Sequence, residues 1–576
     1  MNDINNNESH KLVNFSHVLL NKIVEYLSNN IDKIFFSLVC KRWFKDRERY
    51  LKFRFDHMNL IDQQSSNRIF LNSYQLLINN AINQKNNCTL LFGKEDDTNE
   101  LKCDYIISPD KLRTMNAIQS NINKIILLQG RRYEPEEIMI GKSDLEHLYR
   151  LISNSNVTKL NGCRDLYPDS PLPTKLKSIS FRKIFNQPLF KDCLPSALKK
   201  LKFCHLYNQP LEPGVLPDTL EKLIFDDEFN QPFEPGVLPA SLKVLSLRGR
   251  IYDQQFKVGS LPPNLEVLEY YGVDTPISEG VLPKTLHTLD CARLSWIPHI
   301  KSLPNLKVLK IYLKASYELP KDTQIDLGCI PSSVEKLFIS APSRLFSAMP
   351  PSIKHLSISQ AQYDIDEIFP DRSRYHFETL EVCAFKLESL ENLDIKKLKL
   401  QTYYSSRYIN GEKVDRSKIR PIPNGVEFVN FGYTNQKLFE NEHSIPSSVK
   451  VLKVPMLDCF TRSKLIPSTL EHLKISMDCE IKLRKNILPS SIQKLTLPKL
   501  YLPSPMLFNK NKFSTTPTKS LCIRKLDDQY FIVFGQTYYS FIASIFHKSE
   551  YNDRDKFTSI KYFYQHSKSA KSYVKT

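Results

Sequence analysis

The stretch that decides the fold reads Phe185-Asn186-Gln187-Pro188-Leu189, and it recurs as Tyr207-Asn208-Gln209-Pro210-Leu211 and as Phe229-Asn230-Gln231-Pro232-Phe233. Each copy leads into a Leu-Pro pair, after which an apolar pattern of the form L-x-x-L-x-F begins, as in Leu198, Leu201 and Phe203. The same apolar positions therefore return about every 22 residues. Self-similarity at such a period indicates a stack of similar coils rather than a set of unrelated compact domains.

The apolar pattern continues well beyond these three copies. Its second position falls, in order, on Ile179, Leu201, Leu223, Leu245, Leu268, Leu289, Leu309, Leu337, Leu356, Leu380, Leu398, Val429, Leu452, Leu473 and Leu495. The second and third positions alternate with other residues, as in a short strand that turns one face inward. One coil cannot bury its apolar edge alone, but stacked coils bury it continuously. We therefore predict a mostly β, leucine-rich-repeat-like solenoid of about 15 turns of about 22 residues over 166–500.

The asparagine of the repeated stretch has a specific expected role. A buried side-chain amide at this point can bond the turn backbone of a neighbouring coil, whereas the alternative is an exposed turn asparagine.

These residues resemble the FNIP-repeat family, named for its F-N-x-P core. The resemblance is specific over 185–283, where Asp253 and Asp274 replace asparagine in two turns, and it is weaker through 284–440. It recovers over 445–497. The resemblance implies a protein-interaction scaffold similar to leucine-rich repeats, with no chemistry of its own.

Residues 15–54 are predicted to be helical. Leu19, Ile23 and Leu27 are four residues apart and so form one helical stripe, and Ser16 is a suitable N-cap. The second segment, 34–40, is apolar nearly all round. A forty-residue unit cannot bury two faces of a helix by itself, so either the rest of the chain or a partner should cover one.

This segment resembles an F-box, most clearly in Leu38-Val39-Cys40-Lys41-Arg42-Trp43, and it departs from that pattern where Phe15-Ser16 replaces the usual Leu-Pro. The resemblance implies the substrate-recognition subunit of a Skp–cullin–F-box ubiquitin ligase, in which the solenoid binds the target protein. A helical cap on the solenoid is the alternative. The residues implied to contact the Skp-type adaptor are Phe15, Leu20, Ile23, Leu27, Leu38, Val39 and Trp43.

The rest of the chain is expected to serve these two parts. We predict a disordered tail over 1–14, a mixed connector and N-terminal cap over 55–165, and a C-terminal cap with a basic tail over 501–576. Within these segments the pattern predicts a helix over 144–153, two strands around Asp527-Asp528, and a short helix over 538–546.

The sequence gives no sign of catalytic, cofactor or metal chemistry. The 12 cysteines include no C-x-x-C pair, and the 13 histidines are dispersed. With only 15 glycines, the chain has no glycine-rich phosphate loop. We therefore expect no cofactor, no metal and no enzymatic activity. The N-terminus is polar and no apolar run is long enough to span a bilayer, so the expected location is cytoplasmic or nuclear.

Positive charge is the last feature of the sequence that bears on function. The formal net charge is +18, with basic residues spread along the chain. Acidic Glu269, Asp290 and Glu381 share the exposed mid-strand position with the lysines of the candidate ligand face, which are Lys202, Lys310, Lys399, Lys453 and Lys474. This face favours an acidic or phosphorylated target, or serves only solubility. Two alternatives to the ligase reading remain: a scaffold without ubiquitin transfer, and a polyanion-binding solenoid whose affinity falls steeply with salt.

Overall fold

The computed structural model divides the chain into two compact units, Met1–Asn161 and Gly162–Thr576. The residues that it describes are 14–27, 30–53, 72–74, 76–77, 87–92, 103, 105–107, 109–127, 141–163, 165–182, 184–312, 323–340, 342–384, 390–401, 408–409, 412–413, 421–432, 444–455, 466–475, 491–497, 518–525, 530–537 and 541–547.

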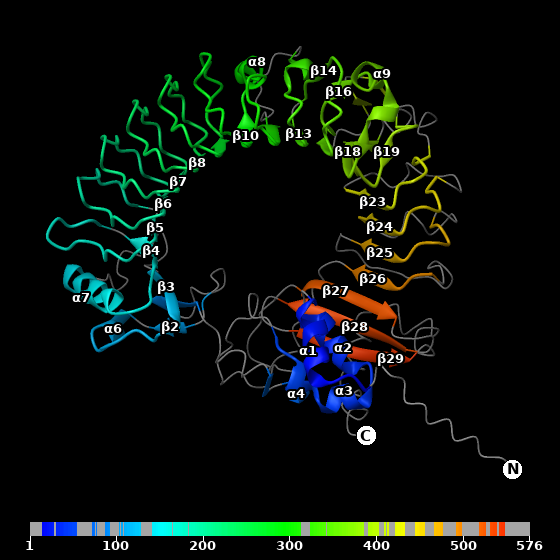
Figure 1. The fold of residues 1–576 in the computed structure, drawn as a ribbon, viewed down its shortest axis with the longest axis horizontal. Helices are drawn as coiled ribbons and strands as arrows, with labels where there is room; N and C mark the ends of the chain where they lie inside the picture. The colour runs from blue at the N-terminus through cyan, green and yellow to red at the C-terminus, as the bar shows by residue number, and fades with distance from the viewer. Residues whose placement is uncertain are drawn as a thin grey trace. The chain divides into compact units, whose positions relative to one another are not determined.

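The first unit begins with four helices, which Figure 1 draws in blue. They are α1 (His17–Glu25), α2 (Asn30–Leu38), α3 (Lys41–Lys45) and α4 (Arg47–Tyr50). The predicted N-cap is confirmed, because the Ser16 hydroxyl accepts a hydrogen bond from the Leu19 backbone N–H at 3.4 Å. At the start of α3 the Cys40 sulfur accepts from the Trp43 N–H in the same way.

The four helices share one apolar core. Its fully buried members include Leu20, Val24 and Tyr50, and Trp43 stacks on Phe36 with ring centroids 4.6 Å apart. The core also contains residues 74 and 77, which lie past the predicted boundary at residue 54. A hydrogen bond of 2.6 Å between the Tyr74 and Ser37 hydroxyls holds Tyr74 in place. Part of the apolar surface of α2 is thus covered from within the chain.

The rest of the first unit that the structure describes includes a 3-10 helix, η3 (Asn72–Tyr74), a small parallel sheet and two further helices. The strands are β1 (Cys88–Phe92), β2 (Tyr105–Ile107), β3 (Ile122–Leu127) and β4 (Lys159–Cys163), paired in the order β2-β1-β3-β4. Helix α6 (Pro109–Leu112) precedes β3, and α7 (Lys142–Ser153) precedes β4. The helix predicted over 144–153 is confirmed by α7, which buries Leu145, Leu148 and Leu151.

The second unit is a parallel β-solenoid, as predicted. In each coil of Figure 1 the strand lies on one side and the connecting segment on the other. Every predicted second-position residue lies on a strand and pairs with its successor, from Ile179↔Leu201 through Leu473↔Leu495. These strands are β5 (Ser178–Phe181), β6 (Lys200–Lys202), β7 (Lys222–Phe225), β8 (Val244–Leu247), β9 (Val267–Tyr270), β10 (Thr288–Ala292), β11 (Val308–Tyr312), β13 (Lys336–Ser340), β15 (His355–Ser357), β18 (Thr379–Cys383), β20 (Lys397–Gln401), β23 (Phe428–Phe431), β24 (Val451–Val454), β25 (His472–Ile475) and β26 (Lys494–Leu497).

The connecting segments carry their own short elements. Strands β12 (Gln324–Asp326), β14 (Arg344–Phe346) and β16 (Gln362–Tyr363) form a second small parallel sheet, and β17 (His376–Phe377) pairs in parallel with β19 (Asp394–Ile395). Strands β21 (Tyr408–Ile409) and β22 (Glu412–Lys413) form an antiparallel pair. Single-turn helices α8 (Ile297–Ile300) and α9 (Ile365–Ile368) complete this side.

The end of the second unit changes to antiparallel pairing. Strand β27 (Thr518–Lys525) pairs with β26, then with β28 (Tyr530–Thr537), which pairs with β29 (Phe541–His547). The two strands predicted around Asp527-Asp528 are confirmed, but the helix predicted over 538–546 is wrong. Its β-branched and aromatic residues suit a strand, and the free edge of β28 offers backbone partners that an isolated short helix lacks.

An aromatic stack runs through the interior of the first coils of the solenoid. Within a coil, rings four residues apart lie face to face, as for Phe203 and Tyr207 with centroids 3.9 Å apart and for Phe225 and Phe229 at 3.8 Å. Between coils, Phe203 stacks on Phe225 at 5.0 Å. The Phe or Tyr of each repeated stretch thus contributes to a continuous buried column, which stabilises neighbouring coils beyond area burial alone.

The repeated asparagines bond the next coil, as predicted. The Oδ1 atoms of Asn186 and Asn208 accept from the backbone N–H of the residue 22 positions later at 2.9 Å, and Asn230 Oδ1 accepts from the Asp253 N–H at 3.1 Å. The expectation that these side chains are buried is wrong, since Asn186 is exposed and the others are partly so. Each of these hydrogen bonds links one coil to the next.

Tyr207→Phe is expected to raise the free energy of unfolding by about 1 kcal/mol. The ring of Tyr207 is fully buried in the aromatic stack, and its hydroxyl has no hydrogen-bond partner among the described residues. Removing an unsatisfied buried hydroxyl removes a desolvation cost and keeps the stacked ring. Thermal and urea unfolding of both proteins measures the change, and the reciprocal Phe229→Tyr should destabilise. A less stable Tyr207→Phe protein would contradict this account.

Candidate functional site

The lysines of the predicted ligand face lie on the strand side of the solenoid, and three of them are neutralised there. Lys202 Nζ lies 2.9 Å from Asp226 Oδ2. Lys310 forms an ion pair with Asp290 on the adjacent strand, and Lys399 Nζ lies 3.8 Å from Glu381 Oε2. These lysines therefore offer a ligand little free charge.

Lys453 and Lys474 differ from the other three. They are register partners on β24 and β25, and the described residues contain no carboxylate paired with either one. Burial lowers the pKa of Lys453, and the positive charges of Lys474 and Lys399 lower it further. The two ammonium groups are thus close enough to repel each other and have no acid between them.

The N-terminal helices carry the second candidate surface. Val39 is 66% exposed and Leu38 is 38% exposed, although both are apolar. On α1 the exposed apolar side chains are Val18, Leu19 and Ile23, and Tyr26 directly after the helix is 90% exposed.

The seven residues implied to contact an adaptor are therefore divided by the structure. Ile23, Leu38 and Val39 are exposed, and Leu27 is half-buried. Leu20 and Trp43 lie in the core of the helices themselves, and Phe15 packs against that core. The first four can contact another protein directly, whereas the other three support the helices that present them.

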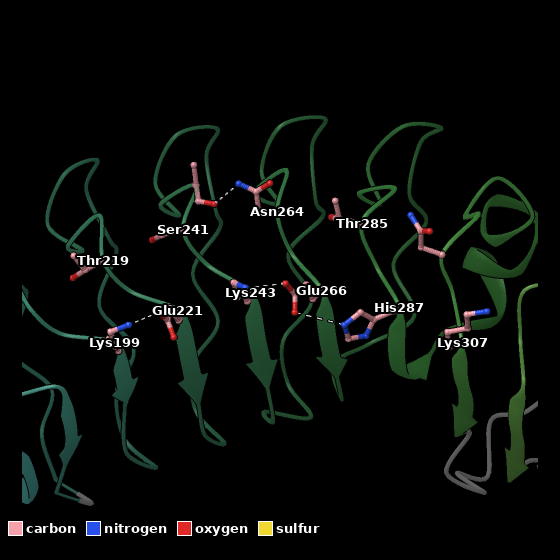
Figure 2. Close-up of a pocket in the computed structure, with 12 residues that line it drawn as sticks. Lys199, Thr219, Glu221, Ser241, Lys243, Asn264, Glu266, Thr285, His287 and Lys307 are labelled. Carbon is pink, nitrogen blue, oxygen red and sulfur yellow. Dashed lines mark hydrogen bonds and ion pairs between the residues drawn. The ribbon is translucent and has the colours of Figure 1, made fainter.

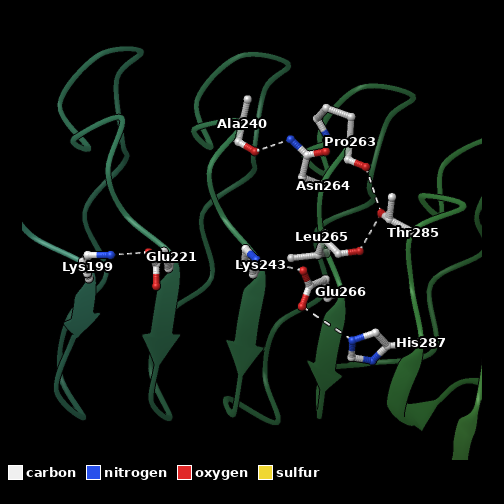
Figure 3. Close-up of polar contacts among 10 residues, drawn as sticks. All are labelled: Lys199, Glu221, Ala240, Lys243, Pro263, Asn264, Leu265, Glu266, Thr285 and His287. Atoms are coloured by element: carbon white, nitrogen blue, oxygen red, sulfur yellow. Dashed lines mark hydrogen bonds and ion pairs between the residues drawn. The ribbon is translucent and has the colours of Figure 1, made fainter.

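An open groove of about 890 Å³ runs along the stack beside the strands of coils β6 to β11 (Figure 2). Its lower row contains charged residues of opposite sign in turn. Lys199 and Glu221 form an ion pair of 2.6 Å, and Lys243 and Glu266 one of 3.1 Å. Glu266 also lies 3.5 Å from His287 (Figure 3). The ion pair and hydrogen bond with Lys199 hold the pKa of the Glu221 carboxyl below its ordinary value.

The upper row of the groove consists of short polar side chains that bond the preceding coil. Thr285 Oγ1 donates to the backbone carbonyls of Pro263 and Leu265, and Asn264 Nδ2 donates to the Ala240 carbonyl at 3.0 Å (Figure 3). In both rows the polar groups form hydrogen bonds or ion pairs with neighbouring coils. These contacts align the stack of coils instead of offering free groups to a substrate.

The sequence contains a signal for the ion pairs of the lower row, and the apolar pattern alone does not use it. The position after the first apolar residue reads Lys199, Glu221, Lys243, Glu266, His287, Lys307, Glu335 and Lys354 in successive coils. Opposite charges one coil apart lie side by side once the coils are stacked in register. A comparison of this position between successive repeats, rather than along one repeat, would have predicted the ion pairs.

The described residues contain no cluster of three His, Cys, Asp or Glu able to hold a metal ion. Burial raises the pKa of the Cys193 and Cys204 thiols and raises that of Cys291 to about 12, which disfavours the nucleophilic thiolate. Within the same part of the chain, every helix is too short or too polar to cross a membrane.

One comparison with known proteins, that with family models, agrees with the repeat seen here. Residues 169–205, 207–249 and 252–290 match the model of the FNIP repeat. A search of curated proteins finds no match. A solved structure described as CroV588, a novel circular LRR protein, is similar over 69% of this chain, at 21% identity and a TM-score of 0.34, and the chain spans 48% of that structure's length. The chain therefore contains three consecutive FNIP repeats within a parallel β-solenoid, the architecture of a protein-interaction scaffold.

Proposed function

We propose that this chain is the substrate-recognition subunit of a Skp–cullin–F-box ubiquitin ligase. The helices of residues 15–54 would dock on a Skp-type adaptor within the cullin complex, inside the cell. The FNIP-repeat solenoid would hold the target protein. Ubiquitin transfer would be catalysed by other subunits, so the work of this chain is to raise the local concentration of the target and orient it.

One observation supports this proposal most strongly: apolar side chains stay exposed on helices that already have a packed core. Val39, Leu38 and Ile23 could have joined the cluster of Leu20 and Trp43, but they point away from it. Exposed apolar side chains that gather on one surface mark protein-interaction sites, and Leu38 and Val39 are exposed next to each other in the sequence. Their positions in the sequence are those that the F-box resemblance assigns to adaptor contact.

The alternative is a protein-interaction scaffold that takes no part in ubiquitin transfer. It is favoured by the position of Phe15, which replaces the usual leucine of an F-box and packs against the helical core instead of extending from it. Ser16, in place of proline, caps α1. In this reading the helices are a folded N-terminal module that uses its exposed apolar residues for some other protein.

The test is co-purification of the full chain with a Skp-type adaptor from the same cell. The expected result is a stoichiometric complex that survives size-exclusion chromatography in moderate salt. Burial of apolar residues resists salt, whereas a complex held by the +18 charge would dissociate as salt rises. Failure of the folded chain to retain the adaptor would overturn the ligase proposal and leave the scaffold.

A further inference from the structure

The outward face of the later solenoid strands has an unusual charge composition. Strands β20, β23, β24, β25 and β26 read KLKLQ, FVNF, VLKV, HLKI and KLTL, and none contains an acidic residue. Strands β9, β10 and β18 each place an acid on the same face, namely Glu269, Asp290 and Glu381. The acids at this mid-strand position therefore end at β18, although Glu427 and Glu471 directly precede β23 and β25.

Four side chains lie in one row on this face. Asn430 on β23 is the register partner of Lys399 on one side and of Lys453 on the other, and Lys453 is in turn the partner of Lys474. Neighbouring strands are about 4.8 Å apart, so Lys453 and Lys474 can reach a single anionic group from two sides. Lys399 already has Glu381 as a partner, whereas Lys453 and Lys474 have no carboxylate partner among the described residues and form the open pair.

Asn430 adds a different kind of group to the row. Its Oδ1 atom is buried and has no hydrogen-bond partner among the described residues. A buried acceptor without a donor costs free energy, and a ligand N–H would remove that cost when the Asn430 side chain turns outward to meet it. The row thus combines an acceptor suited to a peptide N–H with two cations suited to an anion.

We propose that the row formed by Asn430, Lys453 and Lys474 binds an anionic segment of a protein target, with carboxylate or phosphoryl oxygens between the two lysines. This inference rests on the proposed role of the solenoid as the target-binding part of the chain. It assigns the contact to β23–β25 and excludes the paired lysines of the earlier strands. The target is thus recognised by an acidic or phosphorylated stretch.

The arrangement suits a peptide better than a nucleic acid. A nucleic acid needs a continuous basic track along its backbone, and acids interrupt the strand face at β9, β10 and β18. The lysines act as point charges, and the described strands of this face place no arginine beside them. A short segment with one or two anionic groups matches the size of the open pair.

The experiment measures binding of the full chain to labelled peptides by fluorescence anisotropy. Three probes share one Ser-rich sequence and differ in charge: a neutral peptide, one with glutamates, and one with phosphoserines at the same positions. We expect both anionic probes to bind and the neutral probe to bind at least tenfold more weakly, since charge-assisted hydrogen bonds are lost. The relative affinity of the two anionic probes distinguishes a phosphorylated target from an acidic one.

The decisive variant is Lys453→Gln with Lys474→Gln, and the matched control is Lys202→Gln with Lys310→Gln. We expect the first to weaken binding of the anionic probes about tenfold or more, and the control to change it less than twofold. The first variant should keep its melting temperature, because it also removes a repulsion. Equal losses in both variants, no binding of any anionic probe, or tighter binding of a labelled single-stranded nucleic acid would overturn the proposal.

The same preparations separate this proposal from the ligase proposal. Adaptor retention is measured on the wild-type chain and on the Lys453→Gln, Lys474→Gln variant. If the anionic probes bind but the adaptor does not, the ligase proposal fails and the assignment of the anion-binding row stands. If the adaptor binds but the probes do not, the assignment fails and the ligase proposal stands.

Discussion

Leu201→Asp is expected to lower the stability of the solenoid by several kcal/mol, enough to lose its cooperative thermal transition or its solubility. Leu201 is completely buried on β6, between Ile179 and Leu223 of the neighbouring strands. A carboxylate at this point has no cation within the core and must either stay charged without solvent or take up a proton. Both options cost far more than the loss of the leucine side chain alone.

The effect should spread beyond one coil. Each coil of a solenoid is stabilised mainly by its two neighbours, so a coil that cannot pack also exposes the apolar faces on either side. Circular dichroism and differential scanning calorimetry measure the loss, and Lys200→Asp is the matched control because residue 200 is exposed on the same strand. An unchanged melting curve for Leu201→Asp would show that the register is wrong.

The fold could be predicted from the sequence because its apolar column repeats. An aliphatic residue occupies the second position of the apolar pattern in every coil, from Ile179 to Leu495. Only one register turns all of these side chains inward, and the strands pair in that register. A slip of one residue would bring Lys200 or Lys202 into the core, at a large cost. The hydrogen bonds between the repeated asparagines could be predicted for the same reason. Residues 22 positions apart come to lie side by side once the register is fixed.

The parts that sequence reasoning missed depend on relations across coils. The helix predicted over 538–546 followed local pattern alone, whereas the partner edge of β28 decides its conformation. Among the candidate residues, the sequence could not tell Lys453 from Lys202. Asp226, the partner of Lys202, lies 24 residues along the chain, and its proximity appears only when two coils are stacked. The burial of Leu20 and Trp43 likewise depends on how four helices meet.

Leu38→Asp combined with Val39→Asp is expected to abolish retention of a Skp-type adaptor and to leave the chain folded. Both side chains are exposed in the free chain, so charging them costs little folding free energy. In a complex with an apolar partner surface the same two carboxylates would be desolvated without a counter-charge. Truncating a central contact of a protein–protein interface costs about 2 kcal/mol or more, and a buried unpaired charge adds to that cost.

The matched control for this pair is Val24→Asp, which places a carboxylate in the core of the helices rather than on their surface. Val24→Asp should lose adaptor retention and helical signal together, whereas the surface pair should lose adaptor retention alone. Size-exclusion chromatography of each full-length variant with the adaptor, and the melting curve of each variant alone, separate the two cases. Retention of the adaptor by the surface pair would remove Leu38 and Val39 from the interface. Unfolding of the surface pair would instead mean that these side chains belong to the folded core, as expected of a helical cap.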